Sequence, residues 1–178
     1  MSATGIGAIV ACVFAAAFAW WASARAWRID GLHRASDRAR TALTDALANR
    51  RRAANAVVDV VSERYPEACA RVGRALDTPV GDSTGESELT RQMRALAALC
   101  AAEENGGDTP AARAWRCWND ASFVLIAARR FANDRVAQVR RARSPLAVRL
   151  LHLAGRAPLP VAFDMDDEWE DRDARCGH

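Results

Sequence analysis

The most constraining feature of the sequence is an uncharged apolar run over residues 5–24, GIGAIVACVFAAAFAWWASA. A helix of about 20 apolar residues is long enough to cross the hydrocarbon core of a bilayer, which is roughly 30 Å thick. Trp20 and Trp21 lie at the end of the run, where aromatic side chains favour the membrane–water interface. The run therefore predicts a transmembrane helix that contacts the lipid bilayer.

Positive charge follows the run on one side only. Arg25 and Arg28 come directly after it, whereas residues 1–4 carry no charged side chain. Arginine-rich flanks of membrane helices face the cytoplasm. The asymmetry predicts a single-pass protein of the inner (cytoplasmic) membrane, with residues 1–4 outside the cytoplasm and the chain after Ala24 inside it.

Two other interpretations of the apolar run stay open. Residues 22–24, ASA, resemble a signal-peptidase site, and cleavage at Ala24 would give a secreted or envelope protein. Against this, no basic segment precedes the run. Residues 9–12, IVAC, match a loose lipobox that would attach lipid to Cys12, although the apolar run continues well beyond that cysteine.

Composition narrows the function classes. The formal net charge is +3, all 25 basic residues are arginine, and acidic residues are interleaved with them. Such mixed charge does not favour nucleic-acid binding. The five cysteines form no C-x-x-C pair, which favours reduced thiols in a reducing compartment. About 150 residues follow the run, enough for one domain with a core.

Two long series of small or apolar residues repeat with alternating steps of three and four, which predicts helices with one buried face. The first indicates a helix over residues 25–64, continuous with the apolar run, and leaves open whether Pro66 kinks or ends it. The second indicates a helix that opens at Thr109-Pro110 and ends at Ser144-Pro145. The series are Ile29, Leu32, Ser36, Ala39, Leu43, Ala46, Arg50, Ala53, Val57, Val60, and Trp115, Trp118, Ser122, Leu125, Arg129, Ala132, Val136, Val139.

Shorter segments complete the expected fold. Residues 77–85 form a linker, and a helix over residues 86–104 follows, with Ser83 or Ser87 as its N-cap. The pattern of residues 146–154 predicts a short amphipathic helix. This helix either covers the end of the bundle or contacts the membrane. Residues 164–178 predict an acidic disordered tail. No β pattern competes with these helices.

The expected fold class is therefore all-α. An N-terminal transmembrane helix precedes an elongated antiparallel helical bundle, which is built from three long helices and a short C-terminal helix.

Two arginines, Arg50 and Arg129, interrupt the two series, and Asp59 and Asp134 lie within reach of neighbouring turns. One hypothesis is a buried network of arginines and carboxylates that fixes helix register or holds a partner's carboxylate, since buried charge is costly unless paired. The alternative is that the arginine stems pack while their charged ends reach water.

The sequence offers no recognisable catalytic, cofactor or metal motif. His33 and His152 lack other ligands at metal-binding spacing, and Cys176 and His178 form only an isolated pair. There is no Gly-rich phosphate loop or nucleophile elbow. Tryptophans at helical spacing are more typical of a core than of a cofactor platform. We expect a protein that is not an enzyme and uses no cofactor or small-molecule substrate.

Three blocks of the sequence resemble the LemA family of membrane-anchored bacterial helical proteins. Residues 47–61, LANRRRAANAVVDVV, are similar to the family's L-x-x-R…N-L-V-E-T-V segment. Residues 86–90, ESELT, resemble its E-N-E-L-[ST] helix start. Residues 128–134, ARRFAND, resemble its A-R-R-F-Y-N-D block. The chain departs from the pattern at Ala132, where the family has Tyr, and at Asn55, where it has Pro, so it resembles a divergent member.

The resemblance implies a LemA-like cytoplasmic bundle over residues 25–163, behind one N-terminal anchor, with no established enzymatic activity. Together with the absence of site chemistry, it favours a scaffold or adaptor for membrane or peripheral proteins whose identity is unknown. The runner-up is a self-assembling homo-oligomer that organises the membrane.

Overall fold

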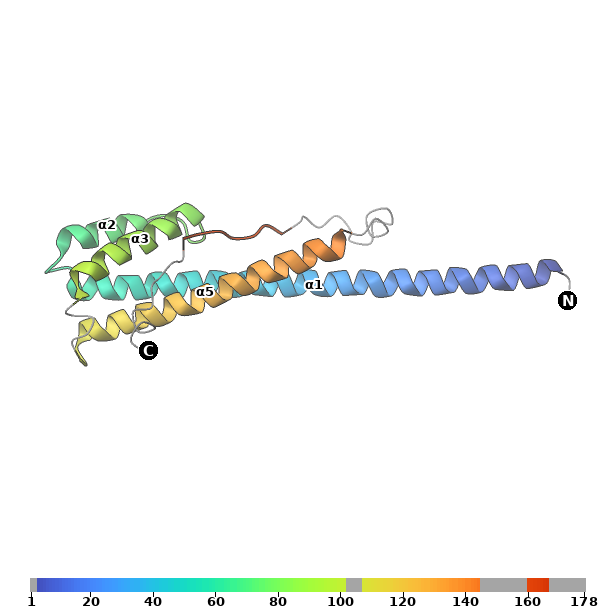
Figure 1. The fold of residues 1–178 in the computed structure, drawn as a ribbon, viewed down its shortest axis with the longest axis horizontal. Coiled ribbons are helices and arrows are strands. Elements are labelled where there is room, and N and C mark those ends of the chain that lie inside the picture. The colour runs from blue at the N-terminus through green and yellow to red at the C-terminus, as the bar shows by residue number, and fades with distance from the viewer. Residues whose placement is uncertain (1–2, 102–106, 145–159, 167–178) are drawn as a thin grey trace, which may run out of the picture. The chain divides into compact units, whose positions relative to one another are not determined.

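The structure is a computed structural model that describes residues 3–101, 107–144 and 160–166. The predicted all-α class is confirmed, because the described residues contain four helices and no strand. Figure 1 shows the helices along the chain. They are α1 (Ala3–Val61), α2 (Pro66–Leu76), α3 (Ser83–Leu99) and α5 (Pro110–Arg143).

Helix α1 contains 59 residues and runs without interruption from the apolar run into the first predicted series. It includes no proline, and Gly31 lies within it without breaking it. The helix ends at Val61, whose carbonyl accepts a hydrogen bond from the Tyr65 N–H at 3.0 Å. Pro66 then begins α2, since a proline lacks an N–H and its fixed φ suits the first helical position. Pro66 thus starts a new helix.

Helix α3 begins at Ser83, ahead of the predicted Glu86, and ends at Leu99 rather than near Glu104. Its N-cap is Asp82, whose carboxylate accepts a hydrogen bond from the Gly85 N–H at 2.7 Å. The predicted caps, Ser83 and Ser87, were therefore wrong. An aspartate directly before the helix satisfies a free N–H of the first turn, and both serines lie inside the helix.

Helix α5 begins as predicted. The Thr109 hydroxyl accepts a hydrogen bond from the Ala112 N–H at 3.1 Å, and Pro110 is the first helical residue. The helix ends at Arg143. The predicted short helix over residues 146–154 lies outside the described residues, and so does the tail from residue 167 onward.

The chain divides into two compact units, and α1 and α5 contribute to both. Unit 1 comprises Met1–Arg38 and Asp134–Val161, and unit 2 comprises Ala39–Asn133 and Ala162–His178. In unit 1, α1 is long and apolar enough to cross a membrane, and none of its most apolar window is buried. No second helix of the described residues meets that description.

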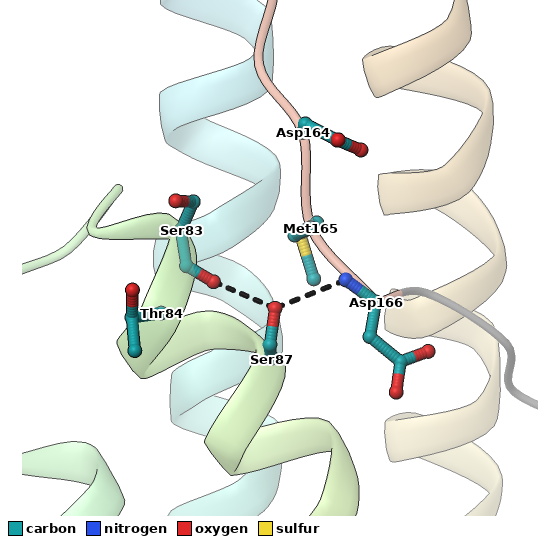
Figure 2. Close-up of a pocket in the computed structure, with 6 residues that line it drawn as sticks. All are labelled: Ser83, Thr84, Ser87, Asp164, Met165 and Asp166. Carbon is teal, nitrogen blue, oxygen red and sulfur yellow. Dashed lines mark hydrogen bonds between the residues drawn. The ribbon is translucent and has the colours of Figure 1, made fainter.

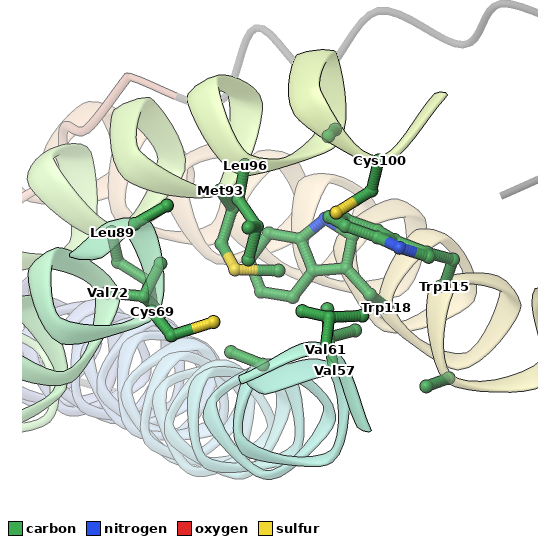
Figure 3. Close-up of a cluster of buried hydrophobic side chains, with 14 of the residues drawn as sticks. Val57, Val61, Cys69, Val72, Leu89, Met93, Leu96, Cys100, Trp115 and Trp118 are labelled. Carbon is green, nitrogen blue, oxygen red and sulfur yellow. The ribbon is translucent and has the colours of Figure 1, made fainter. Parts of the chain in front are cut away.

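Unit 2 contains a hydrophobic core to which α1, α2, α3 and α5 all contribute (Figure 3). Trp115 and Trp118 of α5 lie at its centre and are fully buried, which confirms that these tryptophans are core residues. The core comprises Ala54, Val57, Val61, Ala68, Cys69, Val72, Ala75, Leu89, Met93, Leu96, Ala97, Cys100, Ala114, Trp115 and Trp118.

A second cluster of unit 2 brings the chain's later residues onto the helices. Met165 is only 7% exposed and packs with Leu43, Leu47 and Leu125. Residues 162–166, which we call the strap, are not helical and follow an elongated path in Figure 1. We expected a disordered tail from Asp164, but Asp164, Met165 and Asp166 are ordered on unit 2. The reason is that Met165 supplies an apolar anchor.

Candidate functional site

Two consecutive arginines of α1 are buried inside unit 2. Arg50 is 2% exposed and Arg51 is 7% exposed. Adjacent residues of an α-helix point about 100° apart, so both can be buried only where the helix is covered over a wide arc. Here the side chains of α3, α5 and the α2–α3 loop surround α1 and provide that cover.

Arg50 connects α1 to both α3 and α5. Its Nη2 donates to Thr90 Oγ1 at 2.7 Å, and its Nε donates to Ser122 Oγ at 3.3 Å. Its guanidinium carbon lies 4.5 Å from the centre of the Trp118 ring, a cation–π distance. The arginine is thus held by a hydroxyl on each neighbouring helix and by the face of a core tryptophan.

Arg51 forms hydrogen bonds to the loop between α2 and α3. Its Nη1 donates to the carbonyl oxygen of Thr78 at 2.5 Å, and its Nη2 donates to Thr78 Oγ1 at 3.0 Å and to the carbonyl of Pro79 at 3.2 Å. Its Nε donates to Glu86 Oε1 at 2.8 Å. One side chain therefore satisfies polar groups of a loop that is packed against the core.

Glu86 is the carboxylate of this network, and it is completely buried. Its Oε1 accepts hydrogen bonds from Arg51 Nε and from the Gly81 N–H at 3.4 Å. Its Oε2 lies 3.9 Å from Arg50 Nη1 and accepts no hydrogen bond from the described residues. A buried ion pair is costly to desolvate, and removal of one partner leaves an uncompensated charge. We call Arg50, Arg51, Glu86, Thr90 and Ser122 the polar core.

Arg50 lies in a buried polar cluster, and its partners there are not the predicted carboxylates. Asp59 and Asp134 are exposed, and the carboxylate beside Arg50 is Glu86 instead. The side chain of Arg129 is 18% exposed, and its Nη1 lies 3.9 Å from Asp164 Oδ1 in the strap. Arg129 thus belongs to a different site from Arg50.

Sequence reasoning missed Arg51 and Glu86. Glu86 lies in a Ser-x-x-Glu pattern, which favoured a helix-capping role at the surface. The usable signal was the triplet at positions 50–52, because three consecutive arginines beside a wide apolar stripe cannot all face water.

The strap is bound mainly through its backbone. The Asn133 amide pairs with both polar groups of Phe163: its Nδ2 donates to the carbonyl, and its Oδ1 accepts from the N–H, each at 2.9 Å. The Asp166 N–H donates to Ser87 Oγ, and the Asp166 carbonyl accepts from Thr90 Oγ1, each at 3.0 Å.

Side chains complete the binding of the strap at two points. Met165 is buried between the helices, and Asp166 Oδ1 lies 2.9 Å from Arg94 Nη2. Burial of Met165 contributes about 2 kcal/mol. The four backbone hydrogen bonds add about 1 kcal/mol each. Ordering the five strap residues costs about 1–2 kcal/mol each. These terms nearly cancel, so the strap is held marginally.

An open pocket of about 420 Å³ lies where the strap crosses the start of α3. Figure 2 shows the Ser87 hydroxyl between the Ser83 carbonyl and the Asp166 N–H. The remaining lining is Thr84, Asp164 and Met165. Within the described part of the chain, no three His, Cys, Asp or Glu side chains lie close enough together to hold a metal ion.

The four cysteines of the described residues form two pairs by exposure. Cys69 and Cys100 are buried in the core of unit 2, whereas Cys12 and Cys117 are exposed, and none of these four forms a disulfide. Burial raises the pKa of the Cys69 thiol, which keeps it protonated and unreactive.

The predicted membrane-interface residues lie on α1 in unit 1. Trp20 and Trp21 are exposed, at 78% and 44%, and the rings of Phe18 and Trp21 are 5.9 Å apart. Arg28 is exposed and Arg25 is partly buried. Large apolar side chains with no protein cover are what a lipid-facing helix presents.

Comparison of the chain with family models, curated proteins and solved structures finds no match.

Proposed function

We propose that this chain is a membrane-anchored, non-enzymatic protein of LemA type that acts as a scaffold or adaptor for other proteins. In this proposal residues 5–24 cross the inner membrane, the N-terminus lies outside, and the rest of the chain forms an elongated antiparallel bundle in the cytoplasm. The single observation that carries the proposal is the continuity of α1, which joins the apolar run to the core of unit 2 without a break.

An unbroken helix suits an anchor better than a cleaved signal. A helix whose later turns supply Val57 and Val61 to a folded core couples the bundle mechanically to the membrane segment. The exposed apolar side chains of its first turns, among them Val13, Phe14 and Phe18, need a lipid environment.

Binding rather than chemistry is favoured by the roles of the polar groups. The polar core is occupied with holding α1, α3, α5 and a loop together. In contrast, α5 exposes Phe123 at 71%, Val124 at 54% and Phe131 at 49%. A cluster of exposed apolar residues on one helix is a surface that a partner protein can bury.

The proposal is tested by cross-linking the tagged full-length chain in intact membranes, followed by purification in detergent. We expect other proteins to be recovered with the unaltered chain and lost with Phe123→Asp. Cys117→Asp, at an exposed position about 120° around the same helix from Phe123, is the control and should retain them.

Recovery of only the chain itself, in cross-linked oligomers, would instead support the self-assembling membrane organiser, because the same α5 residues can be buried against a second copy. A mature chain beginning at Arg25 would contradict the anchor and revive the secreted or envelope alternative.

A further inference from the structure

We propose that the groove under the strap is a peptide-binding site, and that residues 162–166 occupy it as a displaceable internal ligand. The intended occupant is an extended segment of another protein with an apolar residue between two acidic residues. This inference deepens the proposed function and rests on it for the existence of a partner, since it names a second site, besides the exposed residues of α5, at which the scaffold binds.

The groove recognises an extended backbone without regard to most side chains. Asn133 binds the N–H and C=O of Phe163, while Ser87 and Thr90 bind the N–H and C=O of Asp166. Peptide-binding domains use this division, in which main-chain hydrogen bonds give affinity and a few side-chain pockets give specificity. A segment from another protein can form the same four bonds.

The specificity contacts define the class of peptide. The central residue of the motif, Met165, fills the apolar site beside Leu43 and Leu125. After it, Asp166 pairs with Arg94 at 2.9 Å. Before it, the side chain of Asp164 is fully exposed, and its Oδ1 lies 3.9 Å from Arg129 Nη1. The groove thus favours an acidic residue, an apolar residue and an acidic residue in succession.

The groove keeps its hydroxyl hydrogen bonds when the strap leaves. Ser87 Oγ donates to the Ser83 carbonyl at 2.7 Å, and its contact with the strap is as an acceptor. Thr90 Oγ1 has the Glu86 carbonyl at 2.9 Å as an alternative acceptor to Asp166. Because a hydroxyl has one proton, it can donate to Glu86 whenever the strap is absent. Departure of the strap therefore orphans no hydroxyl donor.

The groove is also connected to the polar core. Thr90 accepts a hydrogen bond from Arg50 at 2.7 Å, which orients its hydroxyl toward the two carbonyl acceptors. The buried network thereby orients Thr90, a residue of the polar core that also hydrogen-bonds to the strap.

The test uses the full-length chain in lipid nanodiscs and a fluorescein-labelled peptide with the sequence of residues 161–166, VAFDMD. Met165→Asp removes the apolar anchor of the internal strap. We expect this variant to bind the peptide about twofold more tightly than the unaltered chain, because a marginally held strap fills the groove about half of the time. The control Ala162→Asp adds the same charge at an exposed strap residue and should bind like the unaltered chain.

Two changes test the recognition itself. A peptide carrying the Met165→Asp change should not bind, and Asn133→Ala in the Met165→Asp background should abolish binding of the original peptide. No binding to a Met165→Asp chain with unchanged helix content would overturn the proposal and make the strap a fixed part of the fold. A dimer formed by the unaltered chain and lost with Met165→Asp would also overturn it, because the occupant would then be a second copy.

Hydrogen exchange on the unaltered chain tests whether the strap opens, even if the variants unfold. The amides of Phe163 and Asp166 should exchange roughly 100-fold faster than that of Leu96 in α3, since a displaceable strap opens without global unfolding. Equal exchange rates would contradict it. The peptide and exchange tests could fail while cross-linking still recovers proteins that Phe123→Asp loses. The scaffold function would then stand, and its partners would bind to α5 rather than to the groove.

Discussion

Two regions of the same helix bury their apolar residues in different ways. In residues 10–20 of α1 every described side chain is exposed, including Val13, Phe14 and Phe18. In residues 39–61 one face of the helix is buried, with Leu47 at 2% exposure and Val57 at 0%, while Val60, which the series placed on that face, is 45% exposed. The first region has apolar residues all round the helix, while the second alternates them with charge.

The difference fits the proposed anchor, in which each region meets a different solvent. A helix that is apolar on all sides is typical of a membrane span or of the core of a large protein. A helix with one apolar face gains stability from the helices that cover that face. The comparison predicts that a new charge harms the first region at any position, and harms the second only where it meets the core.

The largest effect is expected from charge in the first region. Val13→Arg combined with Phe14→Arg should move the chain out of the membrane, because each arginine in the centre of a span costs about 2.5–3.5 kcal/mol for insertion. The measurement is fractionation of membranes after high-salt washing. Ala42→Arg, at an exposed position of the second region, is the control and should stay membrane-bound. Equal release of both variants from the membrane would show that the two regions of α1 do not differ in their tolerance of charge.

The next largest effect concerns the charge that the second region buries. Glu86→Gln removes the carboxylate beside Arg50 and Arg51 and should destabilise the protein by about 3–5 kcal/mol. Thermal unfolding should show it, since each kcal/mol lowers Tm by roughly 2–4 °C in a chain of this size.

Arg129→Met provides the contrast, because this arginine reaches the surface beside Asp164 and should change stability by less than about 1 kcal/mol. If both variants melted at the temperature of the unaltered chain, the polar core would contribute nothing to stability.

A smaller effect tests how closely the loop held by Arg51 is packed. A Cβ added at Gly85 would lie 2.8 Å from Thr78 Cβ and still closer to its hydroxyl, so Gly85→Ala should destabilise by about 1–3 kcal/mol. Gly73→Ala, where the added Cβ meets no atom within 4 Å, should instead stabilise by about 0.5–1 kcal/mol. Denaturant titration measures the free energy of unfolding of each variant. An increase for Gly85→Ala would show that the loop around Thr78 moves to accommodate the added Cβ.

The smallest effect is expected at the exposed end of α5. A hydrogen bond from Arg113 holds the pKa of Asp108 below its ordinary value, with help from the charge of Arg116. A lowered pKa in the folded state gives stability that is present above the ordinary pKa and is lost as the pH falls through the folded value. Asp108→Asn should therefore lower Tm slightly at pH 7 and not at pH 2, as differential scanning calorimetry can show. A larger loss of Tm at pH 2 than at pH 7 would contradict a lowered pKa of Asp108 in the folded state.

Much of the fold follows from local patterns, whereas the site depends on packing. The apolar run, the two series of small and apolar residues and the Thr109-Pro110 start predicted α1 and α5, because these signals are local in sequence. The partner of Arg50 could not be predicted in this way, since Glu86 reaches it from a different helix. The same holds for Met165, which lies in an acidic segment and is buried only because unit 2 provides a groove for it.

The central claim is that α1 anchors the chain and that unit 2 lies in the cytoplasm. Cys117 tests it most directly, because its thiol is exposed on α5. In a variant without the other four cysteines, a membrane-impermeant maleimide would be applied to intact and to permeabilised cells. The account predicts a full-length, membrane-bound chain labelled only after permeabilisation. Labelling of Cys117 in intact cells would contradict it and place unit 2 outside the cytoplasm.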